Sequence, residues 1–288
     1  MLLVVIEVTL TVLIAWCAWT WPKGHHIWRA AMKPWAILCT ILGMLTGVGC
    51  TPATPEAQAK PAPALARMPR DLEIRFALSA APPHLRRDAT TYVLDPERGY
   101  AVDRKGANGV SCIVVRSDWQ FTKQVFRDDV FWPVCYDAEG SKTLLQDYLL
   151  AARLRARGMS ARDVHEAIAK DVGSPALPNP SRTGVAYMIA PVMRGYTHGP
   201  EPVTMNMPHY MFYAPNVKDA DIGGNGFSEQ YPFVLSMHAG RDDYIIVLVG
   251  QAEKKRILDD SQDLLTELCE YRKYLCTTAE TRARTPVS

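Results

Sequence analysis

The sequence has no excess of charge of either sign, and it lacks the common motifs of nucleotide-binding and hydrolytic enzymes. It contains 32 Lys and Arg and 30 Asp and Glu, and 48% of its 288 residues are hydrophobic. This balance excludes a strongly basic nucleic-acid binder and a highly charged disordered chain. A Gly-x-Gly-x-x-Gly after an expected strand, a phosphate-binding loop and a Gly-x-Ser-x-Gly motif are all missing. The sequence therefore indicates no bound cofactor and disfavours an α/β-hydrolase.

Charge is scarce at the start of the chain. Residues 1–50 hold four of the 62 charged residues, namely Glu7, Lys23, Arg29 and Lys33. Three are positive and one is negative, so this segment carries the whole formal net charge of +2 and residues 51–288 are formally neutral. The first apolar run, 2–21, is long enough to span a bilayer, although Glu7 would cost about 2.5 kcal/mol or more there. The second run, 35–48, is shorter and is typical of a signal-peptide core.

A cysteine closes the second apolar run. Residues 45–50 read Leu-Thr-Gly-Val-Gly-Cys, and the segment from Met32 has a basic start and a short apolar core before Cys50. This pattern resembles the signal peptide of bacterial lipoproteins, although that family prefers Leu at the position of Gly47. The resemblance implies cleavage before Cys50 and lipidation of its thiol with acyl chains such as palmitate. Such a protein is held to a membrane by its acyl chains and needs no spanning helix.

We therefore expect four segments. Residues 1–31 are a wrongly assigned start or an extra hydrophobic segment, 32–49 a lipoprotein signal peptide, 50–71 a Pro/Ala-rich tether, and 72–288 a periplasmic domain. Thr51, rather than Asp, follows Cys50, and by resemblance to Gram-negative lipoproteins this implies sorting to the outer membrane, facing the periplasm. The alternative is an anchor of two apolar helices in the inner membrane.

Expected strands come from β-branched and aromatic runs between turn residues. They cover residues 91–94, 110–116, 185–191, 210–214, 233–237 and 244–250. The last of these is apolar on both faces and is predicted to be a central strand. Residues 72–78 alternate partly, and they fit either a first strand or a first helix.

Expected helices follow the 3.6-residue period of apolar side chains. They cover residues 142–157, ending at Gly158, then 160–171 with Ser160 as N-cap, and 254–276. Strands, two helices, strands and a helix follow one another without a regular βαβ alternation. The sequence therefore predicts an α+β fold, in which one mixed or antiparallel sheet carries two mid-chain helices and a C-terminal helix.

The expected domain contains four cysteines. In the oxidising compartment that the leader implies, Cys112 and Cys135 are predicted to form a disulfide. Cys269 and Cys276 lie seven positions apart on the expected last helix, about 10 Å along its axis. We therefore expect them not to pair with each other. A buried free thiol and a catalytic thiol remain alternatives for Cys112.

The catalytic alternative depends on the order of Cys112 and the histidines. Cys112 followed by His209 at a strand start weakly resembles the papain-like cell-wall peptidases. In that family the His lowers the thiol pKa and accepts its proton. The resemblance implies a thiol hydrolase that uses Cys112 and His209, with His238 as a further candidate. Those enzymes place the Cys at a helix N-terminus, whereas Cys112 lies in an expected strand.

Acidic side chains supply other candidate sites. Asp137 and Glu139 precede the helix at 142–157, so they are candidate acid/base or ligand-binding residues, or simply favour the positive end of that helix. Arg182, at a strand start, is a candidate anion contact. Asp219 and Asp221 lie in a Gly-rich loop and, with His209, are candidate metal ligands of a metal-assisted hydrolase. An ordinary surface loop is the alternative, because the spacing is not that of an EF-hand.

Three short segments carry a second resemblance. Residues 135–141, 184–188 and 211–215, the last followed by 220–223, look like a family of exported bacterial proteins of unknown function. The likeness covers about residues 84–250 and implies no activity. The preferred hypothesis is therefore an envelope lipoprotein with a binding or structural role, whose partner besides the membrane is a protein or the cell wall. The thiol hydrolase and the metal-assisted hydrolase remain alternatives.

Overall fold

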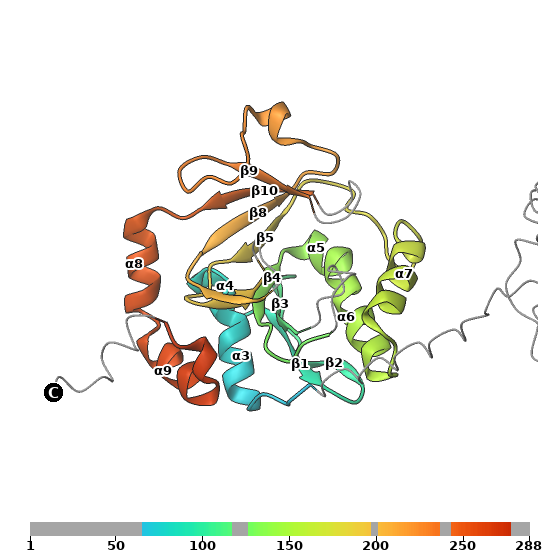
Figure 1. The fold of residues 1–288 in the computed structure, drawn as a ribbon, viewed down its shortest axis with the longest axis horizontal. Coiled ribbons are helices and arrows are strands. Elements are labelled where there is room, and N and C mark those ends of the chain that lie inside the picture. The colour runs from blue at the N-terminus through green and yellow to red at the C-terminus, as the bar shows by residue number, and fades with distance from the viewer. Residues whose placement is uncertain (1–64, 117–125, 197–200, 237–242, 278–288) are drawn as a thin grey trace, which may run out of the picture. The chain divides into compact units, whose positions relative to one another are not determined.

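The computed structural model describes residues 65–116, 126–196, 201–236 and 243–277 (Figure 1). All of them belong to one structural unit, residues 61–288. Cys50, His238, the expected signal peptide and most of the expected tether lie outside the described residues. Within those ranges, none of the helices has the length and apolar character needed to cross a bilayer.

An eight-stranded mixed sheet is the frame of the domain, with the strand order β2-β1-β3-β4-β5-β8-β10-β9. Neighbouring strands are antiparallel, except that β1 and β3 are parallel. A small second sheet pairs β6 with β7. The strands are β1 (Thr90–Asp95), β2 (Gly99–Arg104), β3 (Ser111–Val115), β4 (Trp132–Tyr136), β5 (Val185–Met188), β6 (Met193–Gly195), β7 (Val203–Met205), β8 (His209–Tyr213), β9 (Phe233–Ser236) and β10 (Asp243–Leu248).

Helices and a mixed sheet together confirm the predicted α+β fold. The α-helices are α3 (Arg70–Ser79), α4 (Pro83–Arg86), α5 (Ala138–Lys142), α6 (Leu144–Ala156), α7 (Ala161–Asp171), α8 (Gln251–Asp259) and α9 (Gln262–Tyr271). Two 3₁₀ turns are η1 (Asp219–Ile222) and η2 (Lys273–Leu275). The helix start at Ser160 is confirmed, since its hydroxyl accepts a hydrogen bond from the Asp163 N–H at 3.2 Å. So is the helix end at Gly158, which has a φ of +83°.

Each of the six expected strands is present, while β2, β4, β6 and β7 were not predicted. β4 contains Pro133, a residue that sheet interiors disfavour. β10 has partners on both sides, but it is the penultimate strand and not a central one. The prediction of one long helix over 254–276 is wrong. The helix is interrupted between α8 and α9, and the chain turns back after Tyr271.

Helices cover both faces of the first half of the sheet, β2-β1-β3-β4. α3 packs on β1, β3 and β4 from one side, with α4 and α9 beside it, while α5 and α6 cover the other side and α7 packs on α6 (Figure 1). Cys112 and Val114 of β3 point toward α3, and Ile113 and Val115 point toward α6. All of β3 is therefore buried, which explains its unbroken apolar sequence.

The second half of the sheet, β5-β8-β10-β9, is covered mainly on one face; on the other face, Tyr187 of β5 packs against the core beneath α3. Its inward side chains join the core beneath α5 and α6, as Ala186, Met211 and Ile246 show. The alternate side chains point to the opposite face and are half-buried or exposed. We call this set the open face: Val185, Tyr187, Tyr210, Phe212, Val234, Ile245 and Val247.

Candidate functional site

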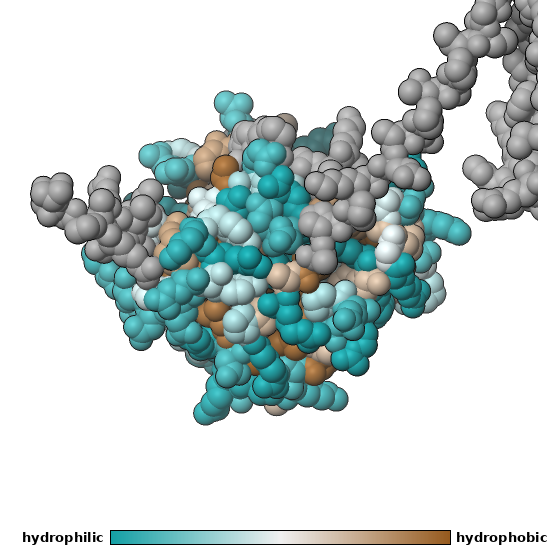
Figure 2. Space-filling view, turned by 60° about the horizontal axis from the view of Figure 1, so that its bottom comes forward, coloured by the Kyte–Doolittle hydropathy of each residue, from teal (hydrophilic) through white to brown (hydrophobic). Residues whose placement is uncertain are grey.

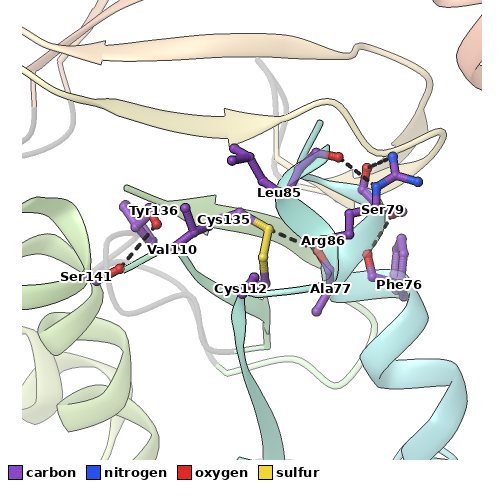
Figure 3. Close-up of a disulfide and its surroundings, with 12 residues drawn as sticks. Phe76, Ala77, Ser79, Leu85, Arg86, Val110, Cys112, Cys135, Tyr136 and Ser141 are labelled. Carbon is purple, nitrogen blue, oxygen red and sulfur yellow. Dashed lines mark hydrogen bonds between the residues drawn. A yellow bond between two sulfur atoms is a disulfide. The ribbon is translucent and has the colours of Figure 1, made fainter. Parts of the chain in front are cut away.

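Cys112 and Cys135 form the predicted disulfide. They lie directly opposite each other on β3 and β4, with their Cα atoms 4.1 Å apart. Both are fully buried beneath α3, and the Cys135 sulfur lies 3.3 Å from the carbonyl oxygen of Ala77 (Figure 3). Because the Cys112 sulfur is bonded, it offers no thiolate nucleophile, and the catalytic-thiol hypothesis is wrong.

The strand order also separates Cys112 from His209. β4 and β5 lie between β3 and β8, so the two residues are three strand spacings apart, about 14 Å. They also face opposite sides of the sheet, since Cys112 is aligned through Cys135 and Tyr187 with Tyr210, the neighbour of His209. A thiol and its base must lie within about 3 Å of each other. The structure therefore does not bring the two candidate catalytic residues together.

His209 is buried in β8. Its Nδ1 lies 2.7 Å from the carbonyl oxygen of Met207, so a protonated Nδ1 donates a hydrogen bond there. Burial lowers the pKa of His209 from its usual 6.5 to about 4. The ring is therefore neutral near pH 7, as expected of a buried histidine that supports the fold.

Cys269 and Cys276 form a second disulfide, which the sequence analysis predicted would not exist. Their Cα atoms are 4.4 Å apart because α9 ends at Tyr271 and η2 folds the chain back. The expectation of about 10 Å assumed one continuous helix. Between the two cysteines, the rings of Tyr271 and Tyr274 lie 6.4 and 6.0 Å from Phe131. The disulfide therefore closes a loop that packs beside β4.

Asp219 and Asp221 bind backbone N–H groups of their own loop. The two oxygens of Asp219 accept from Gly226, at 2.9 Å, and from Val234, at 2.6 Å. Asp221 accepts from Lys218 at 2.8 Å. His209 lies at the far end of β8, about 13 Å from the strand end that leads into this loop. The three candidate metal ligands do not meet, and the described ranges contain no group of three His, Cys, Asp or Glu that could hold a metal.

Asp137 joins three strands and a helix. It is the N-cap of α5, and its carboxylate accepts from the Gly140 N–H at 2.8 Å, the Val185 N–H at 3.0 Å and the Tyr213 hydroxyl at 3.0 Å. A Cβ added at Gly184 would lie 2.3 Å from this carboxylate, so only glycine fits there. The three segments 135–141, 184–188 and 211–215, singled out in the sequence, thus meet at one point. Protein donors occupy the Asp137 carboxylate, and its role is structural.

Glu139 and Arg182 meet in a surface contact. Glu139 accepts hydrogen bonds from the backbone N–H and hydroxyl of Ser181, at 2.5 and 2.8 Å, and these bonds lower its pKa. The Arg182 guanidinium lies 3.7 Å from the same carboxylate and is 70% exposed. Of the candidate ligand-binding residues, these two are neighbours, and their contact fastens the loop before β5 to the first turn of α5.

Two buried charged residues in or beside the first half of the sheet gave no signal in the sequence. Arg116, at the end of β3, is 1% exposed; its guanidinium lies 3.9 Å above the Phe131 ring and donates to the Asp128 carbonyl at 2.8 Å. Glu73 of α3 is also 1% exposed and accepts from the Leu94 N–H at 2.9 Å. Burial raises the pKa of Glu73 from its usual 4.5 to about 7. Periodicity gave no signal for either residue, because each occupies a position that is normally apolar.

The open face consists of two aligned rows of side chains. Val185, Phe212, Ile245 and Val234 are successive partners across the four strands, and Tyr187, Tyr210 and Val247 form the second row. Tyr187 and Tyr210 meet edge to face, with their ring centroids 6.1 Å apart. Neither row contains a charged residue. An antiparallel sheet normally presents polar side chains to solvent, so this face is the candidate binding site.

No protein-family model, no curated protein and no solved structure matches the chain. The disulfides, the leader and the open face are therefore the features that bear on function.

Proposed function

We propose that this chain is an exported envelope lipoprotein whose α+β domain is a binding module in the periplasm. The observation that carries the proposal is the state of the cysteines. All four cysteines in the described part of the chain, Cys112, Cys135, Cys269 and Cys276, are joined in disulfides. Structural disulfides form and persist in oxidising compartments and are rare in the cytosol of most bacteria.

The leader supports the same location. The segment from Met32 to Cys50 has the order of a lipoprotein signal, and Thr51 favours the outer membrane over the inner one. The Pro/Ala-rich stretch that follows has the composition of an extended spacer. An acyl anchor at Cys50 followed by this spacer would hold the domain near the membrane surface.

Binding is favoured over catalysis by the fate of the candidate catalytic groups. Cys112 is bonded to Cys135, His209 is buried and neutral, and Asp137 and Asp219 hold backbone N–H groups. The feature that the fold leaves unused is the open face. A partly exposed apolar surface on a folded domain commonly marks a site of interaction.

Acyl labelling in Gram-negative cells tests the proposal. The full-length chain, expressed in cells fed labelled palmitate, should incorporate label, begin at Cys50 and fractionate with the outer membrane. Cys50→Ala should abolish labelling, whereas the matched leader variant Cys39→Ala should leave it unchanged. Thr51→Asp should shift the labelled protein toward the inner membrane. An unlabelled chain that begins at Met1 would refute the lipoprotein assignment.

A further inference from the structure

Helix α9 ends at a point where its sequence contains no signal to stop. Its last residue is Tyr271, and Arg272 is extended, with a φ of −145° and a ψ of 119°. Helices commonly end at a Gly or an Asn, or shortly before a Pro, and residues 262–277 contain none of these. The apolar period of α9 also continues past its end, from Leu268 through Tyr271 to Leu275. The local sequence therefore does not account for the end of the helix.

The Cys269–Cys276 disulfide does account for it. On a continuous helix, residues seven positions apart are about 10 Å apart along the axis, whereas the two Cα atoms are 4.4 Å apart in the structure. A helix that continues through Cys276 is therefore incompatible with the bond between the two sulfurs. The segment 272–276 thus has two alternative backbone conformations, and the oxidation state of the two cysteines selects between them.

The folded-back conformation is stabilised by packing but also contains unpaired polar groups. Leu275 is fully buried, and the Arg194 guanidinium lies 4.9 Å from the centre of the Tyr274 ring. Among the described residues, however, the buried Tyr274 hydroxyl and the buried Arg272 Nε have no hydrogen-bond partner, which destabilises this conformation. A longer helix would remove both groups from these sites and would place Arg272 and Lys273 near its C-terminal end, where cations are favoured. Opening the disulfide removes the constraint that keeps the turn folded back.

A reductant has unequal access to the two disulfides. Cys112 and Cys135 are fully buried beneath α3, whereas Cys276 is half-buried. α9 lies at the border of the domain, in the lower part of Figure 1. That part comes forward in Figure 2, where the surface is mostly hydrophilic with small separate hydrophobic areas. Since reduction by a thiol depends on access to a sulfur, Cys269–Cys276 is the more reactive of the two disulfides.

We propose that Cys269–Cys276 is a redox switch that sets the length of α9. A dithiol reductant attacks the Cys276 sulfur, the Cys269 sulfur leaves as a thiolate, and the second thiol of the reductant then displaces Cys276. Two electrons and two protons pass to the cysteine pair, and the reductant becomes a disulfide. In the reduced form α9 continues to Cys276, and Tyr274 leaves the Phe131 ring, which lies 6.0 Å away in the bridged form. This regulation goes beyond the binding role proposed above.

Reduction of the full-length protein by dithiothreitol, in detergent, tests the first step. Samples taken during the reaction are alkylated, and peptide mapping by mass spectrometry measures the modification of each cysteine. Cys269 and Cys276 should react at least about tenfold faster than Cys112 and Cys135, because the domain must open before a reductant reaches the buried pair. Equal rates, or faster reaction of the buried pair, overturn the proposal.

Circular dichroism at 222 nm tests the second step. Selective reduction should strengthen the helical signal by about one turn, and the Cys269→Ala, Cys276→Ala variant should show the same gain without reductant. Adding Lys273→Pro should abolish the gain, because proline interrupts a continuous helix but fits the first position of η2 after the extended Arg272.

Two results of this second measurement contradict the switch. One is an unchanged or weaker helical signal in the Ala variant, which would mean that the freed segment does not join α9. The other is a gain that remains after Lys273→Pro, which would place the new helix elsewhere in the chain. Either result overturns the proposal. Neither affects palmitate labelling at Cys50, so failure of the switch and failure of the proposed function are distinguishable.

Discussion

Both halves of the sheet contain strands that are apolar on both faces, but these strands are buried to different extents. β3 and β4 in the first half are apolar on both faces, and helices bury both faces. β8 and β10 in the second half are also largely apolar on both faces, yet only one face joins the core. The difference shows that a strand with apolar side chains on both faces favours burial of both faces. The element that buries the second face comes from elsewhere in the chain or from a partner.

The helical cover thins beyond β4, although Tyr187 of β5 still packs against the core beneath α3, because of where the helices attach. α3 packs on β1, β3 and β4, and its far end meets the chain after β5, where the Ile189 N–H donates to the Ala80 carbonyl at 3.2 Å. α9 packs against α3, to which the Arg75–Glu267 ion pair also ties it. In the described part of the chain, the close packing of α3 and α9 therefore concentrates over the first half of the sheet.

Truncating one aromatic side chain in each half gives the largest expected contrast. Phe76 of α3 is fully buried, so Phe76→Ala should lower the free energy of unfolding by about 3–5 kcal/mol. Phe212→Ala, on the open face, should lower it by less than about 1 kcal/mol, because water already reaches that ring. Urea unfolding of both variants measures the two losses. Equal losses would show that the open face is covered.

Removing each disulfide in turn compares the stability that a disulfide within the sheet contributes with the stability that a disulfide at the border of the sheet contributes. Cys112 and Cys135 are separated by 23 positions, and their joint replacement by Ala should cost about 3.5 kcal/mol in the loop-entropy treatment. Cys269 and Cys276 are separated by seven positions, and the same change should cost about 2.5 kcal/mol. Denaturant unfolding of the two double variants tests the order. A larger loss at the shorter loop would contradict it.

Glu73, beside the first half of the sheet, makes the stability of the domain fall as the pH rises from about 4.5 to 7. Its folded pKa is raised to about 7 from an unfolded value of 4.5, so its stabilising contribution is complete below pH 4.5 and is lost as the pH rises through 7. Glu73→Gln should therefore increase stability at pH 8, by up to about 3 kcal/mol, and change little at pH 4.5. Urea titrations at both pH values measure this. Glu267→Gln, on the exposed face of α9, is the control and should show no gain at pH 8.

His209 gives the second half of the sheet the opposite dependence. Its folded pKa is lowered to about 4, so the unfolded chain binds a proton more readily and stability is lost as the pH falls from about 6.5 to 4. His209→Gln should remove about 2 kcal/mol of the destabilisation at pH 5 relative to pH 7.5. The slope of unfolding free energy against pH measures it, with the exposed His84→Gln as control. An unchanged acid slope would mean that His209 is not buried as described.

The residues that sequence predicted well depend on local chemistry. Ser160 caps a helix through an atom three residues away, and Gly158 ends one through its own backbone. The Cys112–Cys135 pairing was also within reach, since the leader indicated an oxidising compartment. The α+β fold class followed from the order of these elements.

The residues that sequence predicted poorly depend on distant contacts. The Cys269–Cys276 disulfide needed the break after Tyr271, and Glu73 and Arg116 were charged residues in positions that normally hold apolar ones. The helix α9 covers the sheet beside α3, although the two helices are far apart in the sequence: Arg75 and Glu267, which form a hydrogen bond between them, are 192 positions apart. Periodicity reports that a strand is apolar on both faces, but it does not report which faces a helix from another part of the chain will reach.

The central claim is that this domain is exported and matures in an oxidising compartment. Peptide mapping by mass spectrometry, on the full chain isolated from cells with free thiols blocked before lysis, tests it most directly. The account predicts an acylated Cys50 at the N-terminus, together with Cys112–Cys135 and Cys269–Cys276 linked and unblocked. An unmodified chain beginning at Met1, with blocked thiols at these four cysteines, would contradict it.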